Sequence, residues 1–138
     1  MNKATTFDEL DVGHFLDNLD AFSDEEILEI DRMVDELQAR KANKAAYNDL
    51  IEFCKRMQPD YIVGKHHRIL ANLLMDIEQG NKDRICVNIP PRHGKSQLVS
   101  IFYPAWFLGR NPGKKVMMVS HTTDLAVDFG RKVRNLIA

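Results

Sequence analysis

The chain has 138 residues, of which 44% are hydrophobic and 28% are charged, a balance typical of a soluble globular protein with room for one domain. No apolar run approaches the roughly 18 residues that a membrane span needs, and the acidic N-terminus is unlike a secretory signal. Cys54 and Cys86 lie inside apolar runs without metal-ligand spacing. We therefore expect two buried free thiols in a reducing compartment.

The net charge of −1 hides an asymmetry between two parts of the chain. Residues 1–45 contain 12 acidic and 5 basic residues and carry −7, whereas residues 46–138 contain 14 basic and 8 acidic residues and carry +6. The positive part suits phosphate ligands, either nucleotide or DNA, and the negative part suits a protein partner or a solvated arm. Both could equally be solvated faces. We expect an acidic helical segment over 1–45 and a separate domain over 46–138.

The acidic segment is predicted to be helical. The scattered apolar residues of 7–22 predict one or two short helices. Ser23 and Glu26 then have the pattern of a capping box at the start of a longer helix. Its apolar residues form a narrow stripe that favours docking on the chain's own domain over docking on a partner. They are Ile27, Ile30, Val34 and Leu37.

Two more helices are expected before the composition changes. Residues 41–45 suggest a soft junction, and a helix over 46–57 should end before Pro59. A helix over 65–79 has its apolar residues on one side, and Gly80 suits its C-terminal cap.

The rest of the chain predicts an alternation of strands and helices. Residues 84–89 and 115–120 are short, apolar runs rich in β-branched residues and are expected to be strands. Residues 96–108 and 124–137 have helical patterns. Strand, helix, strand and helix at this spacing predict a right-handed βαβ unit with a parallel sheet. The expected fold class is α/β, with a P-loop NTPase-type βαβ core after an all-helical N-terminal segment.

The motif that carries chemistry lies between the first predicted strand and the helix after it. Residues 89–96 read IPPRHGKS and end in the second half of a phosphate-binding loop. Gly94 lets the backbone approach a phosphate, Lys95 would reach the β- and γ-phosphates, and the Ser96 hydroxyl would be a Mg²⁺ ligand. The first glycine of the usual pattern is replaced by Ile89, so the motif is incomplete.

This loop resembles that of the large terminase subunits, the DNA-packaging motor ATPases of tailed bacteriophages. The similarity rests on PPRHGKS after an apolar segment and on KVMMVSHTTDLAVDFGRKVR downstream, and it covers about residues 55–138. His121 occupies a position that is aromatic in the terminase pattern. Residues 1–45 share nothing with it.

The resemblance implies roles for particular residues. Arg92 would sense the γ-phosphate, although a solvent-exposed loop arginine is the alternative. Tyr61 and His67, with His66 beside them, would contact adenine, although histidines on helices are usually packed or solvated. One of Arg131 and Arg134 would complete a neighbouring subunit's site in trans, although a surface ion pair of Arg131 with Asp128 explains that residue equally well. The nucleotide-binding loop would comprise Pro91, Arg92, His93, Gly94, Lys95, Ser96 and Gln97.

Ligands and partners follow from the same resemblance. It implies ATP and Mg²⁺ as cofactors and double-stranded DNA, the portal protein, the small terminase subunit and further copies of the chain in a ring as partners. It places the protein in the host cytoplasm, transiently at the procapsid portal, without a membrane.

The acidic residues that ATP hydrolysis needs are missing from their expected place. No apolar run ends in Asp-Glu, and Asp124 falls inside the last predicted helix. We therefore expect an incomplete domain, with the other half of the ATPase domain and a nuclease in a missing C-terminal part, and little or no ATP hydrolysis by this chain alone. The alternatives are a non-catalytic module that docks a packaging partner, and a different P-loop enzyme such as a helicase-type ATPase or a small-molecule kinase.

Overall fold

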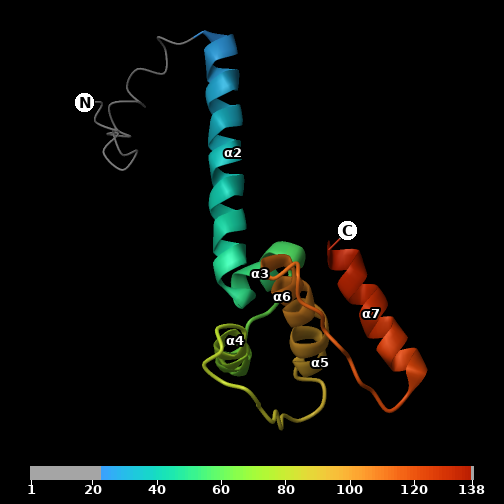
Figure 1. Ribbon diagram of the computed structural model, residues 1–138. Helices are drawn as coiled ribbons and strands as arrows, with labels where there is room; N and C mark the ends of the chain where they lie inside the picture. Colours follow the sequence, from blue (N-terminus) through green and yellow to red (C-terminus); the bar gives the residue numbers. More distant parts are fainter. Residues whose placement is uncertain (1–22, 138) are drawn as a thin grey trace. The chain divides into compact units, whose positions relative to one another are not determined.

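The structure, a computed structural model, describes residues 23–137. Every regular secondary-structure element in this part of the chain is a helix (Figure 1). The short helices expected over 7–22 lie outside the described residues. The elements are α2 (Asp24–Asn48), α3 (Leu50–Met57), α4 (Lys65–Glu78), α5 (Lys95–Gln97), η3 (Leu98–Phe102), α6 (Tyr103–Arg110) and α7 (Thr123–Ile137). No helix among them is both long enough and apolar enough to cross a lipid bilayer.

The predicted α/β fold is wrong, because no residue in 23–137 belongs to a strand and there is no βαβ core. Residues 84–89 and 115–120 adopt no regular secondary structure. Their composition favours extended backbone, but a strand forms only where its N–H and C=O groups bond to a neighbouring strand. Met117 and Val119 remain 87% and 84% exposed instead of lying in a sheet.

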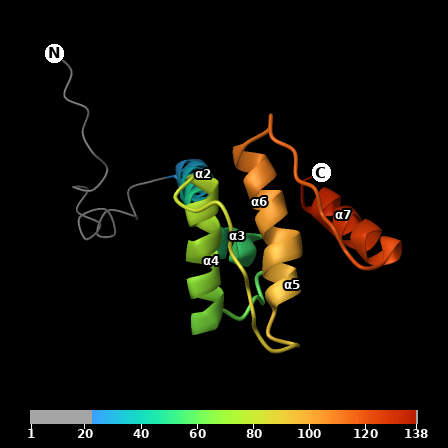
Figure 2. The same cartoon turned by 60° about the horizontal axis from the view of Figure 1, so that its bottom comes forward.

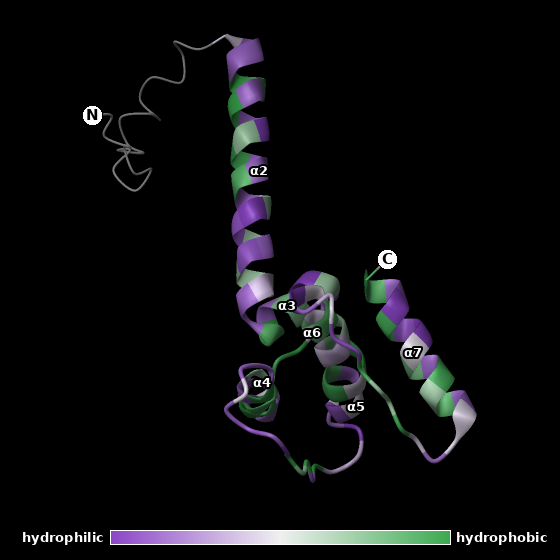
Figure 3. Cartoon of the chain, in the orientation of Figure 1, coloured by the Kyte–Doolittle hydropathy of each residue, from purple (hydrophilic) through white to green (hydrophobic). Residues whose placement is uncertain are grey.

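Helix α2 begins as its sequence predicts. The Ser23 N–H donates to Glu26 Oε2 (2.8 Å) and the Glu26 N–H donates to Ser23 Oγ (3.4 Å), which confirms the capping box. The helix contains neither glycine nor proline and continues through 41–45, where a soft junction was expected. Figure 3 shows it as largely hydrophilic, and two residues of its apolar stripe, Val34 and Leu37, are 42% and 41% exposed.

The chain divides into two compact units, Met1–Ala39 and Arg40–Ala138. The core of the second unit forms where α3, α4 and the helix over 95–110 meet (Figure 2). Asp49 caps α3, since its carboxylate accepts hydrogen bonds from the backbone N–H groups of Ile51 (2.7 Å) and Glu52 (3.0 Å). The buried cluster consists of Leu50, Ile51, Cys54, Tyr61, Leu70, Ala71, Leu74, Leu98, Phe102 and Trp106.

The two cysteines differ from the expectation that both are buried. Cys54 is completely buried, and burial raises the pKa of its thiol to about 12. Cys86 is exposed, because the segment that contains it does not form a strand within a buried sheet.

The helices expected over 65–79, 96–108 and 124–137 are present. The second is a continuous helix over 95–110 composed of α5, η3 and α6. In its middle the Tyr103 N–H donates to the carbonyl of Leu98, five residues earlier, so that one turn is a π turn. Pro104 explains the wide turn, because it lacks an N–H for the carbonyl of Ser100 and its ring would clash with that group in a regular helix.

Candidate functional site

The predicted phosphate-binding loop enters the helix over 95–110 through unusual backbone conformations. Gly94 has φ +72° and is the N-cap, and Arg92 has φ +64°. Arg92 is the only non-glycine residue with positive φ among residues 23–137. A left-handed arginine costs about 1 kcal/mol and persists only where its surroundings enforce it, and such strain is concentrated at functional sites.

The helix start offers backbone donors. Its first internal hydrogen bond runs from the Leu98 N–H to the Gly94 carbonyl (3.0 Å). The N–H groups of Lys95, Ser96 and Gln97 precede that bond and have no acceptor within the helix. Gly94 provides no side-chain cap. The 16-residue helix therefore presents three N–H groups and the positive end of its dipole at the loop, an arrangement that favours an anion.

Two histidines from the first turn of α4 hold the loop. His66 Nε2 lies 3.2 Å and His67 Nε2 lies 3.0 Å from the carbonyl oxygen of His93. The Gly64 N–H donates to His67 Nδ1 (3.0 Å), so this nitrogen is unprotonated and Nε2–H is the donor to His93. Burial, followed by the nearby His66, lowers the pKa of His67 and favours this neutral ring.

Tyr61, the other predicted adenine contact, lies beside His67 in the core. It is only 9% exposed, and its ring centroid lies 5.5 Å from that of His67 and 5.4 Å from that of Phe102. Its hydroxyl is buried without a hydrogen-bond partner, and burial raises its pKa to about 12. The structure brings Tyr61 and His67 together next to the loop, and their contact with adenine stays a prediction.

Of the loop side chains, Arg92, His93 and Ser96 are exposed, whereas Lys95 is half-buried. Lys95 and Ser96 line a cavity of about 500 Å³ that is otherwise mostly apolar. Its other walls include residues of the two segments that were expected to be strands, Ile85, Val87, Val116, Met117, Met118 and Val119. Pro91 is also exposed, and its carbonyl lies 2.8 Å from His93 Nδ1.

The remaining predicted residues lie in different surroundings. Gln97 is half-buried and donates to Gln58 Oε1 (2.6 Å), which ties the helix start to the end of α3. Arg131 and Arg134 are exposed on α7. Asp128, the ion-pair partner considered for Arg131, pairs with Lys132 (2.7 Å). A trans-acting role for either arginine stays a prediction.

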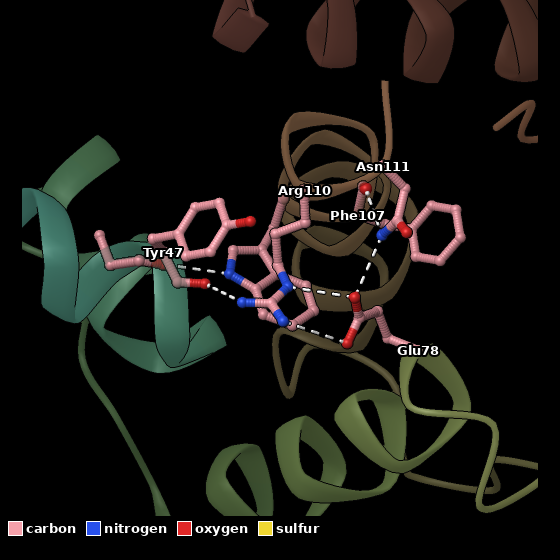
Figure 4. A network of polar contacts seen from close by, with 7 residues as sticks. Tyr47, Glu78, Phe107, Arg110 and Asn111 are labelled. Carbon is pink, nitrogen blue, oxygen red and sulfur yellow. Dashed lines mark hydrogen bonds and ion pairs between the residues drawn. The ribbon is translucent and has the colours of Figure 1, made fainter. Parts of the chain in front are cut away.

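A second polar cluster, which no sequence pattern indicated, lies around Arg110 (Figure 4). The Arg110 Nε–H donates to Glu78 Oε1 (3.1 Å), Nη1–H donates to the carbonyl of Tyr47 (2.6 Å), and Asn111 also donates to Glu78 (3.1 Å). The guanidinium carbon lies 4.7 Å from the ring centroid of Tyr47 and 4.8 Å from that of Trp106. This cluster joins the ends of α2, α4 and α6, and helical periodicity alone could not indicate it.

No group of three or more His, Cys, Asp or Glu side chains in the described part of the chain could hold a metal ion. A Mg²⁺ ion bound through Ser96 and a nucleotide would not need such a group, and it stays a prediction. Comparisons with protein-family models, with curated proteins and with solved structures found no match for this chain.

Proposed function

We propose that this chain binds the phosphate groups of ATP at residues 90–97. The observation that carries the proposal is the junction of Gly94, Lys95 and Ser96, where a left-handed glycine leads into a 16-residue helix whose first N–H groups have no acceptor within the helix. The half-buried Lys95 adds a positive charge beside these donors. The proposed binding depends on the loop and the helix alone and needs no sheet.

Four residues of the loop have definite tasks in this proposal. The N–H groups of Lys95, Ser96 and Gln97 bond to phosphate oxygens, and the Lys95 ammonium reaches the β- and γ-phosphates. The exposed Arg92 side chain binds the γ-phosphate through its planar fork. Ser96 would hold Mg²⁺, which neutralises phosphate charge when it is bound.

We further propose that this binding serves a viral DNA-packaging motor. The support is the resemblance of the PPRHGKS loop and the 115–134 segment to large terminase subunits. On this proposal ATP hydrolysis, translocation of double-stranded DNA, and contacts with the portal protein and the small terminase subunit belong to a ring of subunits in the host cytoplasm. Binding of ATP is the part of the activity that the described residues serve.

The test is titration of a fluorescent ATP analogue, with Mg²⁺, into the wild-type chain and into Lys95→Ala. Loss of the ammonium should weaken binding at least about tenfold, because a hydrogen bond to a charged group contributes about 1.5–3 kcal/mol. Lys114→Ala is the matched control, since Lys114 is exposed and lies outside the loop. It should leave affinity within about twofold. Equal affinity of Lys95→Ala and wild type would refute phosphate binding at this loop.

A second candidate is a non-catalytic module that docks a protein partner. The observation in its favour is the acidic helix α2, on which Leu28 and Met33 are 55% and 53% exposed. Folded wild-type chain that fails to bind the ATP analogue would favour this function over nucleotide binding.

A further inference from the structure

We infer that His67 is a positioning residue, which holds the loop in the shape that receives phosphate through one fixed tautomer of its ring. The effect on nucleotide affinity rests on the proposed function, whereas the effect on the loop does not. His66 supports the same contact from the neighbouring position of α4.

The hydrogen bonds of the two histidines converge on a single peptide group. His66 and His67 both donate to the carbonyl of His93, which can accept two bonds. The peptide bond between His93 and Gly94 is planar and trans, so its N–H points opposite to its C=O. A carbonyl held against α4 therefore directs the Gly94 N–H away from α4. The orientation of this loop donor is set by the histidines.

The loop backbone is also in close contact with the ring. A Cβ atom placed on Gly94 would lie 2.5 Å from His67 Nε2, and Gly94 has φ +72°. Only glycine combines that conformation with that approach. The ring and the backbone thus fit each other at both the hydrogen bond and the van der Waals surface.

The other ring nitrogen fixes the tautomer. His67 is the third residue of α4, and its Nδ1 accepts the N–H of Gly64, the N-cap of that helix. His67 is 8% exposed, so its surroundings leave little room for the ring to flip. With Nδ1 occupied as an acceptor, the proton is on Nε2, where the His93 carbonyl needs it.

The two roles can be separated by substitution. In length, an asparagine side chain reaches the position of Nδ1, and a glutamine side chain reaches the position of Nε2. His67→Asn should keep the acceptor for Gly64 and lose the donor to His93. His67→Gln should keep the donor to His93 and weaken the cap on Gly64. The pair distinguishes loop positioning from stability of α4.

The first measurement is made without nucleotide, by NMR of the full chain. Long-range ¹H–¹⁵N spectra should show His67 with unprotonated Nδ1 and protonated Nε2. Backbone order parameters of His93 and Gly94 should be near 0.85 in wild type and in His67→Gln, and should fall below about 0.6 in His67→Asn. A ring protonated on Nδ1, or unchanged order in His67→Asn, would overturn the inference.

The second measurement is titration with the fluorescent ATP analogue. His67→Asn should bind about tenfold more weakly than wild type, and His67→Gln within about threefold, as expected for one hydrogen bond. A His67→Asn variant with a mobile loop and full affinity would refute the positioning role. Wild type that fails to bind, with the expected tautomer and loop order, would refute the proposed function and leave the positioning of the loop intact.

Discussion

Replacing Arg110 with alanine should destabilise the second compact unit by about 2–3 kcal/mol. The ion pair with Glu78 is intermediate between exposed and buried, since the side chains of Arg110 and Glu78 are 22% and 9% exposed. Its loss should lower the free energy of unfolding by about 1.5–2 kcal/mol. Contacts with the Tyr47 and Trp106 rings should add about 0.5–1 kcal/mol together. Asn111 still donates to the carboxylate in the variant, which keeps the cost below that of a fully unpaired buried charge.

The assay is urea unfolding followed by fluorescence. Trp106 is the only tryptophan in the chain and lies beside Arg110, so its emission reports on this region directly. Circular dichroism gives the same transition through the helices. Arg110→Lys is the matched variant: it keeps the charge, loses the planar fork and should cost about half as much. A loss below about 1 kcal/mol in Arg110→Ala would show that solvent screens these contacts.

The same cluster predicts a pH dependence. Burial opposes ionisation of Glu78, but hydrogen bonds from Asn111 and Arg110 outweigh it and lower its pKa. A carboxyl with a lowered folded-state pKa stabilises the fold above its unfolded pKa of about 4.3, and the contribution is lost as the pH falls through the folded value. Glu78→Gln should be less stable than wild type at pH 7 and should lose less stability on acidification, as measured by the urea midpoint. Equal acid sensitivity of the two proteins would contradict this assignment.

Two further predictions concern the loop and the cysteines. Gly94→Ala should lower the free energy of unfolding in urea by about 1–3 kcal/mol, because φ +72° is strained for alanine and the new Cβ meets His67. Gly109→Ala, where a new Cβ would meet nothing within 4 Å, should leave that free energy unchanged or raise it by up to about 1 kcal/mol. Cys86 should react with a thiol reagent within seconds in the native protein while Cys54 reacts only on unfolding; rapid native labelling of both would show that the core opens readily.

Helices were predictable from the sequence because their signals are local. The capping pair Ser23 and Glu26, and Gly80 with φ +78° after α4, mark helix ends within a few residues of the chain. The expected strands failed for the opposite reason. The apolar runs over 84–89 and 115–120 predicted burial, but a strand depends on a backbone partner that no local pattern specifies.

In the candidate site, too, the local features could be predicted from the sequence and the contact between distant residues could not. Gly94, Lys95 and Ser96 were expected at a helix start and lie there, because a glycine before a helix is a local signal. That His67 would bond to the loop, 26 residues away along the chain, could not be deduced from spacing. Contacts of this kind depend on how α4 packs against the helix over 95–110.

The π turn at Leu98–Phe102 keeps one side of the long helix facing the core. Leu98, Phe102 and Trp106 follow one another at intervals of four residues. In a regular α-helix each such interval turns the side chain about 40° further around the axis, so the three would not all face the same core. The wider turn between Leu98 and Phe102 rotates less per residue and offsets the drift between Phe102 and Trp106. All three are 3% exposed or less and stay aligned along the core. The loop over 90–97 at one end and Arg110 at the other therefore have fixed directions around the helix relative to one straight row of buried side chains.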